Sequence, residues 1–291
     1  MDHLGHDLTE FLVTGAGGYL GGRVLAMLRN RNRNALGVDK SESCDLVCDL
    51  CDHDATTSML AQHPDSTVIH CAAAVPKSRS GYLDEAAANE SLNMVRQLAR
   101  AGPRRVIFIS SMTVYPDGTL LAQEHDAAST GKGYAASKLE AERVFLERRD
   151  VSTTILRLPG LFGLPRRGGV LFNSALTLAR GEVPALDAEL PQWAAMHVDD
   201  AAEICVRAAT MPAIASMVMN AGYPERMSIS AAVGRLAGLF GRTLHLPAPK
   251  WFEFDLSRLH AELGSVVGRF ADRLNDLAEW AQKDVANDPH S

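Results

Sequence analysis

Short apolar runs alternate with stretches of helical periodicity along the first half of the chain. Runs rich in Val, Ile, Leu and Thr predict strands, because such residues favour the pleated backbone. These strands are expected at residues 11–14, 35–39, 46–48, 67–71, 106–110 and 153–158. Apolar positions that recur every three or four residues predict helices between them. These helices are expected at residues 21–30, 54–63, 84–101 and 134–149.

The predicted strands are apolar on both faces, and this decides the fold class. A strand without polar alternation is buried on both sides, which is typical of a parallel sheet covered by helices. Strands that alternate with helices therefore predict an α/β fold with a doubly wound parallel sheet.

The pattern loosens after Phe162. Residues 163–169 predict a loop, and the last eight residues are expected to be frayed. Between them we expect a strand at 217–220 and helices from 199 and near 228–240, 255–263 and 270–283. We interpret this half as a smaller lid domain on the carboxyl edge of the sheet.

A glycine-rich turn follows the first strand and opens the first helix. Gly15, Gly18 and Gly21 have the spacing G-x-x-G-x-x-G. The first glycine of such a turn allows a tight bend, the second lets the backbone approach a pyrophosphate, and the third lets helix and strand pack closely. The helix N-terminus adds the positive end of a dipole. We expect a dinucleotide here, with Tyr19 and Leu20 among its contacts; a plain turn is the alternative.

Two acidic positions follow the next strands. Asp39 ends the second strand, 24 residues after Gly15. A carboxylate there can bond the ribose hydroxyls of NAD and repel the 2′-phosphate of NADP. The neighbouring Lys40 keeps NADP as an alternative cofactor. Asp49 and Leu50 follow the third strand and are expected to bond and pack on the adenine. The alternative is that both acids lie in solvated turns.

A tyrosine and a lysine, Tyr134 and Lys138 in YAASK, share one face of a predicted helix. An ammonium near a phenol favours the phenolate, so Lys138 is expected to lower the pKa of Tyr134. Ser110 and Ser111 end a buried strand, at the sheet edge where ligands of such folds bind. A hydroxyl there can bond a substrate oxygen. A solvated helix face is the alternative for the tyrosine and lysine.

Composition narrows the function classes. The chain has 291 residues, with 29 basic and 35 acidic side chains and a net charge of −6, which argues against nucleic-acid binding. Apolar residues make up 46%, as in ordinary globular proteins. No apolar run reaches the roughly 18 residues of a membrane helix, and the N-terminus carries acids where a signal peptide is basic. We expect a soluble, cytoplasmic protein without a membrane partner.

A cysteine cluster, Cys44, Cys48 and Cys51, has the spacing C-x3-C-x2-C, with His53 nearby. A structural zinc site needs four ligands, usually in two pairs. Five cysteines in a chain of this size also argue against a disulfide framework. We therefore expect no metal, and instead three half-buried thiols around a short strand.

Several motifs, taken in order, resemble the extended short-chain dehydrogenase/reductase family, also called the NAD-dependent epimerase/dehydratase family. They are VTGAGGYLG (13–21), VIHCAAAV (68–75), ISSMTVY (109–115), YAASK (134–138), ILRLPGLFG (155–163) and HVDD (197–200). The resemblance implies a Rossmann sheet, NAD as cofactor and a nucleotide-sugar substrate. We expect a dinucleotide-binding domain of residues 1–164, to which 193–222 return, and a substrate domain of 165–192 and 223–291.

The family's residue roles carry over by position. Tyr134 resembles the general acid/base, Lys138 the residue that holds the nicotinamide ribose and lowers the tyrosine pKa, and Ser111 the hydroxyl partner of the reacting oxygen. By similarity, three residues would lie beside the cofactor: Cys71, Ala72 and Ala73.

Three further residues are expected to be structural. His70 is interpreted as a neutral core histidine, and His197 and Asp199 are expected to fix the return from strand to helix. The resemblance also implies a homodimer in which helices 84–101 and 134–149 form a four-helix interface. Its apolar surface is expected from Leu139, Phe145 and Leu146.

The chain departs from the family where the substrate is concerned. Met112 and Thr113 stand where dehydratases usually carry an acidic pair, which disfavours 4,6-dehydration. Gly160 stands where sugar-nucleotide epimerases usually have asparagine, and Trp193 where they usually have arginine. Residues 247–250 replace a further arginine-containing stretch.

The missing arginines normally clamp a nucleotide diphosphate, because a planar guanidinium matches phosphate oxygens. Arg166 and Arg167, flanked by glycines and a proline in the predicted loop, can replace them. A flexible basic surface loop is the alternative.

Three functions remain in comparison. The leading hypothesis is a sugar-nucleotide oxidoreductase, most simply an epimerase that works through a transient keto-sugar. The second is a one-way ketoreductase or dehydrogenase, which the short lid and the missing arginines favour. The third is a nucleotide-sensing or scaffold protein, which would be expected to lack the tyrosine or the lysine of the pair.

Overall fold

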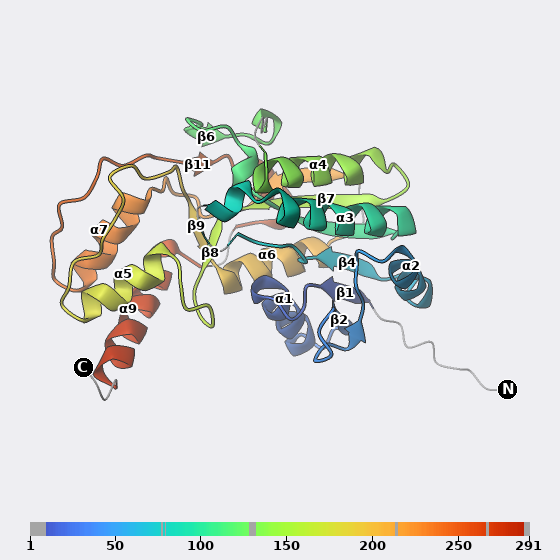
Figure 1. Cartoon of the computed structure of the whole chain (residues 1–291), viewed down its shortest axis with the longest axis horizontal. Helices are drawn as coiled ribbons and strands as arrows, with labels where there is room; N and C mark the ends of the chain where they lie inside the picture. Colours follow the sequence, from blue (N-terminus) through green and yellow to red (C-terminus); the bar gives the residue numbers. More distant parts are fainter. Residues whose placement is uncertain are drawn as a thin grey trace. The chain divides into compact units, whose positions relative to one another are not determined.

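The computed structural model describes residues 10–76, 78, 80–127, 132–212, 215–265 and 268–287 (Figure 1). Its largest sheet has seven strands in the order β10-β7-β5-β4-β1-β2-β3. They are β1 Phe11–Thr14, β2 Ala35–Asp39, β3 Leu46–Val47, β4 Thr67–His70, β5 Arg105–Ser111, β7 Ser152–Leu158 and β10 Met217–Asn220. The pairs from β3 to β5 are parallel. This is the predicted α/β fold with a doubly wound parallel sheet.

Helices cover both faces of this sheet. They are α1 Tyr19–Asn30, α2 His53–Gln62, α3 Glu85–Ala101, α4 Tyr134–Glu147 and α6 Val198–Thr210. Figure 1 shows α3 and α4 side by side on one face, with α1 and α6 on the other. An aspartate caps the N-terminus of each of two of these helices: Asp52 accepts hydrogen bonds from two backbone N–H groups of α2, and Asp84 from two of α3. These caps satisfy donors that the helix itself leaves open.

Most predicted boundaries are correct to within two residues. Strand β4 ends at His70 and β3 ends at Val47, so Cys71 and Cys48 lie just outside them. Helix α1 begins at Tyr19, inside the glycine turn. Helix α9, Phe270–Ala286, continues through residues that we expected to be frayed, and residues 288–291 lie outside the described part.

The chain divides into two compact units by its internal contacts. The first holds residues 1–116, 127–157 and 202–219, and the second holds 117–126, 158–201 and 220–291. The second unit includes β8 Gly160–Phe162, which pairs with β9 Ala195–His197. The predicted domain bounds stay a prediction. The assignment of substrate binding to this second unit stays a prediction.

Helices dominate the second unit. Helix α5 Val170–Ala179 was not predicted, and it packs against α7 Ile229–Leu239 and α9. Helix α8 Ser257–Leu263 and the two-residue strands β6 Leu121–Ala122 and β11 Glu253–Phe254 complete the unit. No helix in the described ranges combines the length and the apolar character that a membrane crossing requires.

A buried aspartate fastens the start of α6 to α9. Asp200 is 2% exposed, and Arg273 donates to both of its carboxylate oxygens at 2.9 and 2.5 Å. Tyr223 donates a further short hydrogen bond. The backbone N–H of Asp199 donates to His197 Nδ1 at 3.3 Å. These contacts agree with the structural role expected for the strand-to-helix return.

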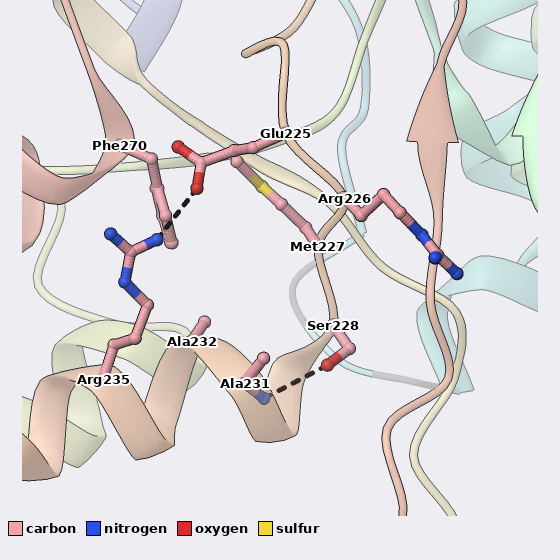
Figure 2. A pocket seen from close by; sticks show the side chains of 8 residues that line it. All are labelled: Glu225, Arg226, Met227, Ser228, Ala231, Ala232, Arg235 and Phe270. Atoms are coloured by element: carbon pink, nitrogen blue, oxygen red, sulfur yellow. Dashed lines mark hydrogen bonds and ion pairs between the residues drawn. The ribbon is translucent and has the colours of Figure 1, made fainter.

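A shallow pocket of the second unit lies beside the N-terminus of α7. Arg235 pairs with Glu225 at 2.8 Å, and Ser228 accepts a hydrogen bond from the backbone of Ala231 at 3.1 Å. The lining residues, all labelled in Figure 2, are Glu225, Arg226, Met227, Ser228, Ala231, Ala232, Arg235 and Phe270. Its charged groups are matched within the unit, since Arg226 also faces Glu253 at 3.9 Å.

The prediction of an apolar surface on α4 is wrong for two of its three residues. Phe145 is completely buried in the core between α3, α4 and the sheet, and Leu139 is 9% exposed. Leu146 is 38% exposed and remains on the surface. The periodicity of α4 reflects packing inside one chain, so the homodimer stays a prediction that these side chains do not support.

Phe145→Ala should lower the free energy of unfolding by about 3–5 kcal/mol, because a fully buried aromatic ring leaves a cavity. The control is Leu146→Ala, one residue along the same helix, for which we expect a change within about 0.5 kcal/mol. Urea unfolding followed by circular dichroism measures both. Equal effects of the two substitutions would contradict the assignment of Phe145 to the core.

Candidate active site

The glycine turn has the geometry expected of a close bend. Gly15 has φ +70°, and its carbonyl accepts from the N–H of Gly18 at 2.9 Å. A Cβ on Gly15 would lie 2.7 Å from the backbone nitrogen of Ala72. A Cβ on Gly21 would overlap the carbonyl oxygen of Gly15. Gly15 therefore allows the bend and the approach of the next strand, and Gly21 allows helix α1 to sit against the turn.

The start of α1 offers a positive end to a ligand. Gly18 is the N-cap residue, no side chain caps the helix, and its first turn holds no acidic residue. Gly17 and Gly18 are exposed. A helix N-terminus with exposed backbone and no carboxylate attracts an anion such as pyrophosphate. The residues of the turn thus fit the dinucleotide that the sequence predicts.

Asp39 lies beside this turn. Its Oδ2 accepts from the N–H of Gly17 at 3.2 Å, and its side chain is partly exposed. Lys40 points toward Glu90, with Nζ 3.4 Å from the carboxylate. The carboxylate of Asp39 therefore stands next to the turn while the positive charge of Lys40 is partly balanced, which favours NAD over NADP.

Asp49 and Leu50 follow β3, and Asp49 lies in a turn, as in the alternative interpretation. Asp49 Oδ1 accepts from the N–H of Cys51 at 2.9 Å, within its own turn. Leu50 is 4% exposed and belongs to the hydrophobic core. A role of Asp49 and Leu50 toward the adenine stays a prediction.

The end of β4 borders the glycine turn. The N–H of Cys71 donates to the carbonyl of Thr14 at 3.1 Å, and Ala72 lies against Gly15. Cys71, Ala72 and Ala73 are all partly exposed. Burial raises the pKa of the Cys71 thiol to about 12, with the charge of Lys138 opposing. The thiol is therefore protonated at neutral pH and is no nucleophile.

Ser111, Tyr134 and Lys138 come together at the end of β5. Ser111 is the last residue of that strand, and Tyr134 is the first residue of α4. The hydroxyl of Ser111 forms a hydrogen bond with the Tyr134 phenol and accepts from Thr113 Oγ1 at 3.0 Å. Lys138 Nζ donates to the carbonyl of Ile109 at 2.8 Å and lies 5.7 Å from the centre of the Tyr134 ring.

The pKa of Tyr134 moves in the direction opposite to our expectation. Burial raises the pKa of the phenol, the neighbouring Tyr82 adds to this rise, and the hydrogen bond to Ser111 lowers it. Burial is the largest cause because the phenolate loses its hydration. The ammonium of Lys138 is directed at the carbonyl of Ile109 and not at the phenol oxygen.

Lys138 is itself unusual because it is 6% exposed. Burial lowers its pKa to about 8, although the charge of Glu142 acts in the opposite direction. The side chain therefore changes between charged and neutral forms within reach of physiological pH. This makes Lys138 a candidate for proton transfer as well as for binding.

A buried ion pair that sequence reasoning missed supports this helix. Glu142 lies one turn after Lys138 and accepts two hydrogen bonds from Arg157 of β7, at 3.0 and 2.6 Å. Ser110 Oγ donates to Glu142, and Arg157 donates to the hydroxyl of Tyr115 at 3.0 Å. The signal in the sequence was the acid four residues after Lys138 on the same helix face.

His70 is the core histidine that we expected. It is 1% exposed, its Nδ1 lies 2.8 Å from Thr14 Oγ1, and its ring stacks on Phe108. Burial, helped by the charge of Lys138, lowers the pKa of His70 to about 3. The imidazole is neutral at physiological pH and does not serve as a general acid.

The two candidate arginines of the loop have different surroundings. Arg167 pairs with Asp284 of α9 at 3.2 Å and covers the ring of Trp280 at 5.4 Å. Arg166 is exposed. The ion pair of Arg167 must break before that guanidinium binds a phosphate, so the structure favours the surface-loop alternative for Arg167.

Gly160 and Trp193, the two departures from the epimerase pattern, lie against each other in the second unit. A Cβ on Gly160 would lie 3.2 Å from Nε1 of Trp193. Trp193 packs on a small apolar cluster that includes Leu190 and Val233. The indole thus occupies the space beside residue 160. Trp193 places an apolar side chain at the position where sugar-nucleotide epimerases usually have an arginine.

The cysteine cluster consists of thiols in different environments. Cys48 is 7% exposed, and Cys44 and Cys51 are partly exposed, as expected around a short strand. Burial raises the pKa of all three thiols. Since thiolates and not thiols ligate metals, these surroundings do not favour a metal site.

Comparison with known proteins places this geometry in a family. A family model described as "NAD dependent epimerase/dehydratase family" matches residues 11–222. A zebrafish (Danio rerio) protein, methionine adenosyltransferase 2 subunit beta, is 34% identical over 155 residues, which are 52% of this chain and 48% of that protein. The chain thus spans about half the length of this curated relative.

Two further proteins match nearly the whole chain. UDP-glucose 4-epimerase of Vibrio cholerae is 23% identical over 303 residues, covering 96% of this chain and 88% of that protein. The structure of MoeE5 in complex with UDP-glucose and NAD has a TM-score of 0.76 and 24% identity, over 95% and 99% of the two chains. Since the family model covers well over half of the residues, the chain belongs to the NAD dependent epimerase/dehydratase family.

Proposed function

We propose that the protein is a sugar-nucleotide oxidoreductase, and that it acts as an epimerase through a transient keto-sugar. The observation that carries the proposal is the meeting of Ser111, Tyr134 and Lys138 at the end of β5. The substrate class is supported by the UDP-glucose 4-epimerase and by the UDP-glucose complex of MoeE5.

The cofactor would be held by the glycine turn around Gly15 and Gly18, by Asp39, and by Lys138. When bound, NAD supplies the group that accepts a hydride from the sugar and returns it. In this proposal Asp39 orients the adenosine ribose, and the exposed backbone of the turn holds the pyrophosphate. The Ala72 backbone against Gly15 keeps the turn closed.

Tyr134 acts as the general base and acid at the sugar hydroxyl. Its phenolate form takes the hydroxyl proton during oxidation and becomes the phenol, which gives the proton back on reduction. Ser111, hydrogen-bonded to the phenol, shares the reacting oxygen and sets its direction. Because the pKa of Tyr134 is raised by burial, its protonated form dominates at neutral pH, which favours proton return to a carbonyl.

A second candidate function has a specific observation in its favour. Trp193 lies in an apolar cluster beside Gly160, and Arg167 is held by Asp284. Both features weaken the usual binding of a diphosphate. A one-way ketoreductase or dehydrogenase of a keto-sugar or a smaller substrate would use the same Ser111, Tyr134 and Lys138.

Retention of cofactor distinguishes the two functions. An epimerase keeps its nicotinamide through the cycle, so the purified protein should carry NAD that survives gel filtration and does not exchange during turnover. A ketoreductase should release the cofactor and consume it one-for-one with product. Stoichiometric consumption of added NADH with UDP-glucose-derived keto-sugar would overturn the epimerase proposal.

Tyr134→Phe should reduce kcat about 10²- to 10⁴-fold, which is the usual contribution of a general acid or base. The ring volume is retained, so NAD affinity and unfolding should be unchanged. Conversion of UDP-glucose, followed by coupled detection of its epimer, measures the rate. Full activity of a folded, NAD-binding Tyr134→Phe protein would mean that the helix pair is only a solvated face.

Asp39→Ala should weaken NAD binding about 10- to 100-fold, since hydrogen bonds to a charged group contribute about 1.5–3 kcal/mol. The ratio of NADP to NAD affinity should rise, because the repelling carboxylate is gone. Glu42→Ala, which removes an exposed acid from the next loop, is the matched control. Calorimetry measures both cofactors. Tighter binding of NADPH than of NADH by the unaltered protein would refute this assignment.

A further inference from the structure

A short 3₁₀ helix, Ser80–Leu83 (η1), is seated on the first turn of α4. Gly133, the N-cap residue of α4, has φ +70° and is buried. A Cβ on Gly133 would overlap the carbonyl oxygen of Tyr82 and lie 2.9 Å from Cα of Leu83. The glycine therefore lets η1 approach the helix start as closely as two backbones allow.

The close approach of η1 to α4 places a second tyrosine, Tyr82, beside Tyr134. The rings of Tyr82 and Tyr134 meet edge to face, with centroids 5.6 Å apart and an interplanar angle of 89°. This is a preferred geometry for an aromatic pair, so it fixes the orientation of both rings. Tyr134 is thus held from three elements: by Tyr82 of η1, by Ser111 of β5 and by its own helix α4.

Tyr82 is nevertheless open to solvent. It is 43% exposed, and its neighbour Leu83 is 71% exposed. Val75, 54% exposed, lies on the same connection between β4 and α3. A large ring that contacts the Tyr134 ring on one side and is 43% exposed has a free surface next to Tyr134. Aromatic surfaces of this kind commonly line ligand sites.

We propose that Tyr82 is a positioning and substrate-contacting residue of the site around Tyr134: it fixes the phenol from one side, and its exposed face is the wall on which the reacting sugar ring packs. The inference rests on the proposed role of Tyr134 and deepens it. It commits to a substrate whose reacting part presents an apolar C–H face, as a pyranose ring does.

The proposal has a consequence for proton transfer. The groups that face the Tyr134 phenol are Tyr82 from η1, Ser111 from β5 and, farther away, Lys138 from α4. Tyr82 contributes to the raised pKa of Tyr134, and its ring lies against the Tyr134 ring with the centroids 5.6 Å apart. Removal of the ring should therefore lower the pKa of Tyr134, so that the phenolate forms at lower pH.

The first test needs no substrate. The chain has five tyrosines, so spectra of protein labelled with ¹³Cζ-tyrosine are simple, and Tyr134→Phe identifies the Tyr134 signal. In the unaltered protein this signal should stay unmoved up to about pH 11, since the raised pKa keeps the phenol protonated. In Tyr82→Leu it should begin to move within that range. Identical behaviour of the two proteins would overturn the positioning role.

The second test measures the substrate contact with UDP-glucose as the probe and the NAD-loaded full chain. Tyr82→Leu should lower kcat/KM about tenfold, with part of the loss in KM and with NAD affinity unchanged. Tyr82→Phe keeps the ring and should retain most of the activity. Leu83→Ala removes the more exposed neighbour and should behave like the unaltered protein. Equal kcat/KM in Tyr82→Leu and Leu83→Ala would overturn the substrate contact.

The two failures are distinguishable. If the unaltered protein does not turn over UDP-glucose, the proposed substrate class fails, and the tyrosine spectra still decide whether Tyr82 positions Tyr134. If Tyr134→Phe loses activity while Tyr82→Leu matches the unaltered protein in spectra and kinetics, the proposed function stands and the role of Tyr82 fails.

Discussion

The buried ion pair between Glu142 and Arg157 fixes the depth at which α4 lies against the sheet. The two side chains are 2% and 4% exposed and are joined by two hydrogen bonds. Removing one partner of such a pair leaves an uncompensated buried charge and typically costs about 3–5 kcal/mol. Helix α4 is therefore held against β5 and β7 in one orientation about its axis. This orientation determines where the residues one and two turns earlier lie.

Those earlier residues are Lys138 and Tyr134. Because α4 is held close, Lys138 is drawn out of solvent and its Nζ reaches the carbonyl of Ile109. Tyr134 then lies at the end of β5 beside Ser111. The same burial that assembles the site also sets its proton chemistry, since it raises the pKa of the phenol and lowers the pKa of the ammonium.

The sequence predicts the parts of the structure that local rules govern. The strands of the large sheet are continuous apolar runs, and the glycine turn needs residues without a Cβ at fixed spacing, so both are legible. The two- and three-residue strands β6, β8, β9 and β11 are defined by partners far along the chain and leave no local pattern. Helix α5 is apolar on most sides, which hides its periodicity.

The candidate site is predictable in its members and less so in its electrostatics. The spacing of Tyr134 and Lys138 correctly predicts that they share a helix face, but it does not reveal how deeply that face is buried. Phe145 was placed on the surface for the same reason, because a charged helix can still bury one stripe. The partners Glu142 and Arg157 are 15 residues apart and lie on different elements, so their pairing depends on the tertiary fold.

The burial of Lys138 is the claim on which the site depends most directly, and its titration tests it. Labelled lysine side chains followed by NMR, with Lys138→Arg to identify the signal, give its pKa in the protein free of cofactor. The account predicts a midpoint of about 8, because burial outweighs the charge of Glu142. A midpoint at the ordinary lysine value of about 10.4 would contradict a buried lysine and the assembled site with it.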